Sequence, residues 1–197
     1  MSHKIGPLRN GNIALIAGIA WFLQGAASVI LPDPTWVLDI TMIAPMILTF
    51  FAVRVFLNAQ SAGATRLGRI GQMVMAVTAI VIVPGQIGAA AELSWLNWLA
   101  FPVGALGLTV GLVLTGIATL RAKEFPRWSG ILLIASEFLA VLTGLALSPI
   151  SPIVNHGDYT GAMAHGVVWL LISRRLLGHH SVQPLSAEWG RELAPQP

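Results

Sequence analysis

Two apolar runs decide the fold predicted for this chain: WSGILLIASEFLAVLTGLAL at residues 128–147 and YTGAMAHGVVWLLISRRLL at residues 159–177. Each is long enough to cross a bilayer as an α-helix, which takes about 20 residues. The first contains Glu137 and the second contains His165. With the span boundaries given below, no other carboxylate or histidine lies deep within an apolar run.

Counting from the basic residues places these two groups at the same depth. Arg127 and Arg174 mark the ends of the two runs at one membrane edge. Glu137 is ten residues from Arg127 and His165 is nine from Arg174, so both lie roughly 14–15 Å inside a hydrocarbon core about 30 Å thick. We therefore expect antiparallel helices whose two side chains hydrogen-bond directly or through one water. Such a pair is a candidate ligand or proton site; the alternative is a hydrogen bond that joins two helices.

The composition places most of the chain in lipid. Of its 197 residues, 55% are apolar and 10% are charged, whereas a soluble domain carries about 25% charged residues. The chain has no cysteine, which excludes disulfides and thiolate metal sites. We expect the lipid bilayer as a partner and no nucleic acid, because the basic residues are placed as topology signals.

The hydropathy pattern predicts an all-α polytopic bundle of six transmembrane helices, separated by connections that contain helix breakers. The predicted spans cover residues 12–31, 40–57, 70–91, 97–120, 128–147 and 159–177. Residues 1–177 then form one transmembrane domain, followed by a cytoplasmic tail at 178–197. We interpret the first run as a retained span and not a cleaved signal peptide, because its apolar character continues through Leu31.

The basic residues predict the orientation of the bundle. All eleven Lys and Arg lie at the two termini or at and beside the second and fourth connections, whereas the first, third and fifth connections contain none. By the positive-inside rule both termini face the cytoplasm, which an even number of spans also requires. The predicted location is therefore the cytoplasmic (inner) membrane, with a multi-pass chain and both ends inside.

A faint repeat suggests that the bundle consists of three tandem helical hairpins. Arg9, Arg69 and Arg127 each open an odd-numbered span, and a glycine follows each within three residues. The alternative is that any helices of one orientation carry basic residues at their cytoplasmic ends.

Small residues mark faces where helices can approach closely. Gly104, Gly107 and Gly111 form a ridge on the fourth span. Gly130 and Gly144 lie seven residues before and after the carboxylate of the fifth span, on one face. The partner of the ridge is either another span of this chain or another subunit.

Three further residues join the candidate site. Gln24 and Gln86 lie in the outer halves of the first and third spans, and Pro84 beside Gln86 can free backbone carbonyls as in transporter sites. The alternative for the glutamines is an interhelical amide bond at a structural kink. Trp169 follows His165 by four residues and shares its helix face.

Several chemistries lack the residues that they need. Haem of the b type requires histidines at facing positions on different helices, but His165 is the one histidine within a predicted span. Clustered metal ligands, nucleophile–base sets and phosphate-binding loops are missing from the sequence. We therefore expect no metal, no cofactor and, on balance, no enzyme activity.

Two segments, FPRWSGILL at residues 125–133 and AHGVVW at residues 164–169, resemble small multipass bacterial membrane proteins of unknown function. The resemblance implies a bacterial cytoplasmic membrane and carries no activity with it.

The leading functional prediction is a non-enzymatic membrane component that binds a partner subunit, a second copy of itself or an apolar ligand. The alternative is a small proton-coupled transporter that uses Glu137 and His165. A cavity distinguishes them: a transporter needs a polar crevice that reaches Glu137, whereas a packing subunit buries this side chain in a dry interface.

Overall fold

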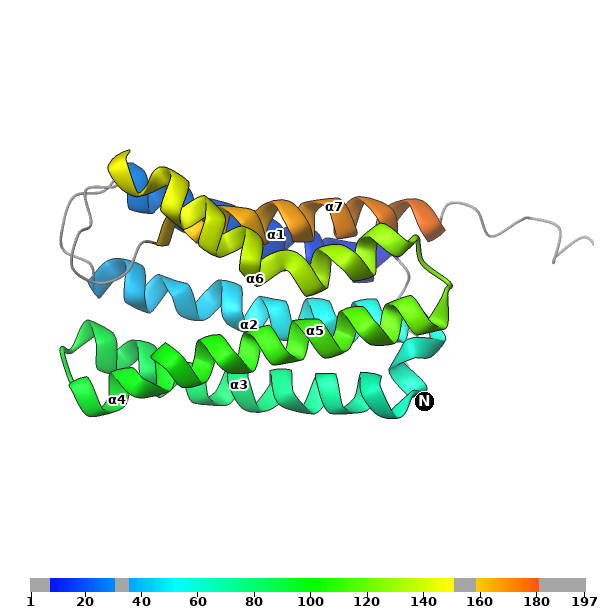
Figure 1. Ribbon diagram of the computed structural model, residues 1–197, viewed down its shortest axis with the longest axis horizontal. Helices are drawn as coiled ribbons and strands as arrows, with labels where there is room; N and C mark the ends of the chain where they lie inside the picture. The colour runs from blue at the N-terminus through cyan, green and yellow to red at the C-terminus, as the bar shows by residue number, and fades with distance from the viewer. Residues whose placement is uncertain (1–7, 31–35, 151–158, 181–197) are drawn as a thin grey trace, which may run out of the picture.

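The computed structural model describes residues 8–30, 36–150 and 159–180 (Figure 1). Every regular element within these residues is a helix, which confirms the all-α class. The long helices are α1 (Leu8–Ile30), α2 (Trp36–Asn58), α3 (Arg66–Ala90), α5 (Ala105–Ala122), α6 (Arg127–Leu147) and α7 (Ala162–His180). The short ones are η1 (Ser61–Ala64), α4 (Ser94–Trp98), η2 (Leu99–Gly104), η3 (Ser148–Ile150) and η4 (Tyr159–Gly161). Residues 181–197 of the predicted tail lie outside the described residues.

Five segments of the described chain are long and apolar enough to cross a membrane. They are Gly11–Ile30, Trp36–Asn58, Arg66–Ala90, Ser94–Ala122 and Arg127–Ile150. Helix α7, with 19 residues, is not among them, because His165, Arg174 and Arg175 lower its mean hydropathy. Five predicted spans are therefore supported by length and composition, and the sixth stays a prediction.

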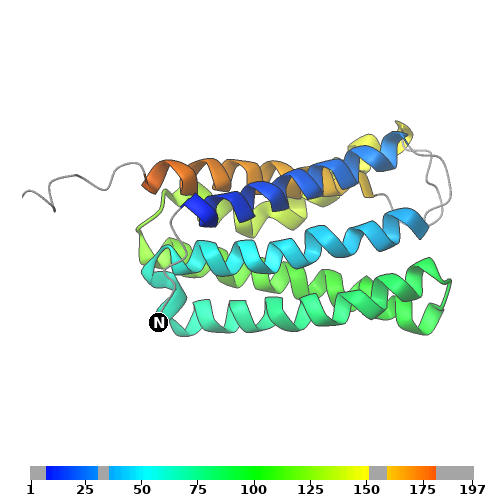
Figure 2. The ribbon, with the colours of Figure 1, turned by 180° about the vertical axis from the view of Figure 1, so that it is seen from behind.

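The long helices form a closed ring in chain order. Each packs against the next, from α1 through α2, α3, α5 and α6 to α7, and α7 closes the ring against α1. Figures 1 and 2 view the bundle from opposite sides and show the long helices running along its long axis. Both a set of three hairpins and a simple up-and-down bundle have these neighbours, so the repeat also stays a prediction.

Glycines set the close, antiparallel contact between α1 and α7. A Cβ atom at Gly18 would lie 2.8 Å from the backbone nitrogen of Leu170. Seven residues later in α1, a Cβ at Gly25 would lie 2.6 Å from the backbone nitrogen of Met163, seven residues earlier in α7. The two backbones therefore touch over two turns, as small residues permit in membrane helices.

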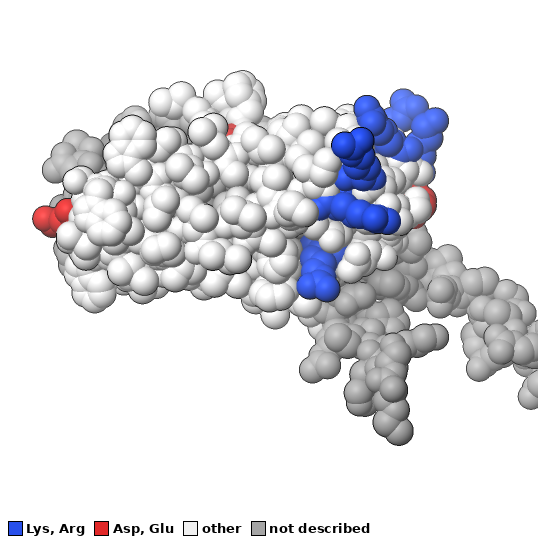
Figure 3. Space-filling model, turned by 90° about the horizontal axis from the view of Figure 1, so that it is seen from below, with Lys and Arg blue, Asp and Glu red and all other residues white. Residues whose placement is uncertain are grey.

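The outer surface of the bundle is apolar along its length and basic at one end. Large side chains such as Ile80 (73% exposed) and Leu145 (68% exposed) point outward. On the face drawn in Figure 3, Lys and Arg gather at one end of the long axis. That end holds the carboxyl ends of α2, α5 and α7 and the amino ends of α3 and α6. A soluble protein rarely exposes so much apolar surface, and a lipid-facing one requires it.

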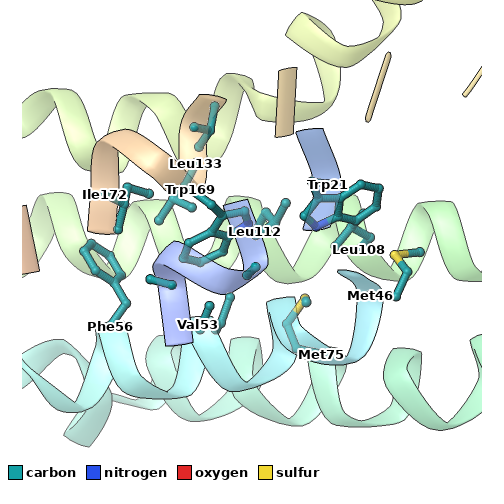
Figure 4. Packing of buried hydrophobic residues seen from close by; sticks show 14 of the residues in the cluster. Trp21, Met46, Val53, Phe56, Met75, Leu108, Leu112, Leu133, Trp169 and Ile172 are labelled. Carbon is teal, nitrogen blue, oxygen red and sulfur yellow. The ribbon is translucent and has the colours of Figure 1, made fainter. Parts of the chain in front are cut away.

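The apolar core lies inside the ring. Figure 4 shows Trp169 of α7 in the middle of this cluster, which also contains Phe56 of α2, Leu112 of α5 and Leu133 of α6. Each of these side chains is almost completely buried. Trp169 is therefore a core residue.

Two differences from the predicted spans bear on the site. Helix α2 begins at Trp36, four residues before the predicted start, so that Asp39 lies in its first turn and is buried. The fourth span is interrupted at Phe101, whose extended backbone (φ −127°, ψ 122°) separates α4 and η2 from α5. Pro102 explains this break, because proline disfavours helical backbone in the residue before it.

Candidate functional site

A cavity of about 330 Å³ lies inside the ring, in the half of the bundle away from the basic end. Residues of α1, α2, α3, α5, α6, α7, η2 and η4 line it. Its inner wall is apolar and includes Trp21, Met46 and Leu108. Phe101 and Leu145 lie at its rim and are exposed on the outer surface, so the cavity opens sideways between η2 and α6.

The divergence of α5 and α6 creates this space. Near the basic end, the Cβ that Gly116 lacks would lie 2.6 Å from the carbonyl oxygen of Gly130, so the two backbones touch. Fourteen residues after Gly130, a Cβ at Gly144 would meet nothing closer than the backbone nitrogen of Gly161, at 3.9 Å. Figure 1 shows α6 rising away from α5 in this direction. Gly130 therefore lies against the backbone of α5, whereas Gly144 faces the cavity.

Glu137 and His165 meet in this cavity. His165 Nε2 lies 3.3 Å from Glu137 Oε2, and the side chains are 6% and 31% exposed, respectively. The predicted proximity of the two groups is confirmed, although the geometry is too poor for a hydrogen bond. The ring of Trp21 packs on the imidazole with a centroid distance of 4.8 Å. This buried imidazole with a partly accessible carboxyl can bind a polar group or pass a proton, and that role stays a prediction.

Gln86 contributes a second polar group to the cavity wall. Its side chain is 2% exposed, and its Oε1 atom accepts no hydrogen bond from any described residue. The preceding Gly85 allows α3 to approach η2, because a Cβ there would collide with the backbone of Ala100. The sequence prediction placed Gln86 near the site, and the structure brings it to the same cavity as Glu137 and His165.

The structure places the other two predicted site residues elsewhere. The Gln24 amide donates to the carbonyl oxygen of Leu38 at 2.7 Å and accepts from Thr41 Oγ1 at 2.9 Å, which joins α1 to α2. Trp169 is packed in the apolar core. Neither residue lines the cavity. Trp169 and His165 lie on one face of α7, but only His165 reaches the cavity.

A hydrogen-bonded pair that the sequence did not predict also reaches the cavity. Tyr159 lines it, is buried, and donates its phenolic hydrogen to Asp39 Oδ1. A tyrosine at the end of an apolar run is typically a half-wet anchor at the membrane interface, but Tyr159 is buried. The pair was missed because the hydropathy boundary at Ile40 left Asp39 outside the predicted span. A helix that starts at Trp36 instead places Asp39 in its first turn.

The glycine ridge of the fourth span packs against α3. Added Cβ atoms at Gly104, Gly107 and Gly111 would collide with Ile82, Thr78 and Met75, respectively. The partner of this ridge is therefore a helix of the same chain.

Within the described residues no group of three or more His, Asp or Glu side chains could hold a metal ion. Comparison of the chain with models of known families, with curated proteins and with solved structures finds no match. The interpretation of the site therefore depends on its own geometry.

Proposed function

We propose that this protein is an integral membrane protein whose side-opening cavity binds an apolar ligand from the bilayer. The observation that carries the proposal is the cavity of about 330 Å³ between η2, α5 and α6. Binding pockets are typically apolar with a few converging polar groups, and here those groups are Glu137, His165 and Gln86. Of the predicted binding partners, the cavity favours a ligand over a subunit.

The break at Phe101 supports the same proposal. Non-helical backbone at membrane depth occurs where it is buried in protein or lines a cavity, since lipid offers no hydrogen-bond partners. Phe101 interrupts the fourth span and lines this cavity. A ligand site accounts for the irregular segment more simply than a helix that has only a packing role.

Six spans with both termini in the cytoplasm complete the proposal. Helix α7 lies antiparallel to α1 and in close contact with it along its length. Because the two helices lie side by side, α7 spans the membrane if α1 does. The basic end of the bundle in Figure 3 then faces the cytoplasm by the positive-inside rule.

Saturable binding of lipophilic probes tests the ligand site. Purified protein in phosphatidylcholine nanodiscs is titrated with radiolabelled 12-carbon probes that carry an alcohol, a carboxylate or an ammonium head. At least one probe should bind saturably, and Gly144→Phe should remove that binding, because position 144 faces open space in the cavity. Ala146→Phe is the matched control, since Ala146 is exposed and does not line the cavity. Failure of all three probes to bind saturably would overturn the proposal.

Proton-coupled transport is the second candidate, favoured by the contact of the cavity with the Glu137–His165 pair. In proteoliposomes with an internal pH dye, the protein should then carry protons when a bound probe is supplied on one side. Glu137→Gln should stop this flux, whereas exposed Glu92→Gln should leave it unchanged. If the protein binds a ligand without transporting protons, neither the unmodified protein nor the Glu92→Gln variant should show flux.

A further inference from the structure

We infer that the cavity selects an amphipathic ligand whose polar head is a protonated amine, held by Glu137 and Gln86. This inference rests on the proposed function and specifies the chemical class of its ligand. Three properties of the cavity lead to it: the charge of its wall, the hydrogen-bonding capacity left free there, and its size.

The charge of the wall disfavours an anionic head. None of the described residues that line the cavity is Lys or Arg, whereas Glu137 lies in its wall and Asp39 lies directly behind Tyr159. Like charges repel strongly where water is scarce, and an ion at membrane depth requires a counter-charge. A carboxylate or phosphate head would find no Lys or Arg among the described lining residues, and His165 already faces Glu137. An ammonium would find the Glu137 carboxylate.

Two buried hydrogen-bond acceptors remain free in the cavity wall. Gln86 Oε1 and Glu137 Oε2 are buried atoms that accept no hydrogen bond within the described chain. Two nearby donors are already engaged, since Tyr159 donates to Asp39 and Trp21 Nε1 donates to Thr49 Oγ1 at 2.6 Å. His165 Nε2 faces Glu137 Oε2 at 3.3 Å. A buried acceptor without a donor is costly, so the complementary head must supply N–H or O–H groups. An ammonium supplies several donors together with the positive charge.

The size of the cavity sets the size of the apolar body. A cavity of about 150 Å³ holds one benzene molecule, so a cavity of about 330 Å³ accommodates roughly 13 non-hydrogen atoms. Exposed Phe101 and Leu145 at the rim let a longer chain continue into the surrounding lipid. An amine with a 12-carbon chain therefore fills the space with its head beside Glu137.

The head-group series tests the inference on the unmodified protein. In zwitterionic phosphatidylcholine nanodiscs, we expect n-dodecylammonium to bind at least tenfold more tightly than 1-dodecanol, because charge-assisted hydrogen bonds are the stronger ones. Dodecanoate should bind more weakly than the alcohol. Binding to nanodiscs that contain Gly144→Phe protein is subtracted as the contribution of the lipid. Equal or tighter binding of the alcohol or the carboxylate would overturn the inference and leave the cavity proposal standing.

Two variants assign the selectivity to particular residues. Glu137→Gln should reduce dodecylammonium binding at least tenfold and bring it to the level of dodecanol, whose own binding should change less than threefold. Gln86→Met keeps the length of the side chain and should weaken both probes together, because Oε1 accepts from either head. Glu92→Gln, an exposed carboxylate outside this cavity, is the charge-matched control. Retention of the ammonium preference by Glu137→Gln protein would show that another group binds the head.

Discussion

The same substitution, glycine to alanine, should have opposite effects at two positions near the cavity. At Gly166 of α7, an added Cβ would lie 2.6 Å from the backbone nitrogen and 2.8 Å from the Cα of Phe22 in α1. At Gly144 of α6, nothing lies closer than 3.9 Å. Both residues are helical, so alanine brings the same gain in helix propensity to each.

The structure sets the magnitude of the difference. Carbon atoms pack best at about 3.5–4.0 Å, so α1 and α7 must separate by about 1 Å to accept alanine at Gly166. Overpacking of this kind costs about 1–3 kcal/mol, and the helix propensity of alanine offsets about 0.5–1 kcal/mol of it. Gly166→Ala should therefore lower the free energy of unfolding by up to about 2.5 kcal/mol. Gly144→Ala should raise it by about 0.5–1 kcal/mol, because the propensity gain meets no clash.

Unfolding in mixed micelles by titration with dodecyl sulfate, followed by circular dichroism, measures both changes. Gly18→Ala is a second test of the α1–α7 contact that does not adjoin His165; its Cβ would lie 2.8 Å from the Leu170 nitrogen, so it should also destabilise the fold. Equal effects of Gly166→Ala and Gly144→Ala would refute the close contact of α1 with α7 or the open space at position 144.

Three other predictions concern topology and the polar pairs. Reporter fusions after residues 60, 122 and 197 should report the cytoplasm and fusions near 34, 94 and 154 the outside; one reversed site would contradict six spans. Tyr159→Phe should lower the free energy of unfolding by about 1.5–3 kcal/mol, because it removes a buried hydrogen bond to the carboxylate of Asp39, whereas exposed Trp95→Phe should change it little. Glu137→Gln should cost less than about 1 kcal/mol and Glu137→Leu about 1–3 kcal/mol, since leucine leaves the buried His165 without a polar partner; equal costs measured in the same unfolding assay would show that the pair does not contribute.

The sequence was sufficient to predict the helices and the meeting of Glu137 with His165. Both predictions depend on local regularities: an apolar run of fixed minimum length, and a constant rise per residue counted from Arg127 and Arg174. Equal depth on neighbouring helices left rotation about the helix axis as the remaining variable, and the observed 3.3 Å contact shows that both side chains turn inward.

The cavity could not be predicted in this way, because it depends on pairs of residues distant in the sequence. Gly130 and Gly144 occupy the same face of α6, yet only Gly130 meets a neighbour, the backbone of Gly116. Nothing in the spacing of the glycines distinguishes the two positions. The Asp39–Tyr159 bond joins residues 120 positions apart, and hydropathy alone placed Asp39 outside its helix.

The glycine at position 144 also bears on the meaning of the cavity. Protein interiors are close-packed, and voids much larger than a water molecule are few. Alanine at position 144 would meet nothing closer than 3.9 Å, would fill part of the space and would favour the helix. Glycine instead leaves the cavity open beside two buried acceptors, Gln86 Oε1 and Glu137 Oε2. Both the open space and the free acceptors cost stability in an empty protein, and a bound amphipathic donor would offset both costs at once.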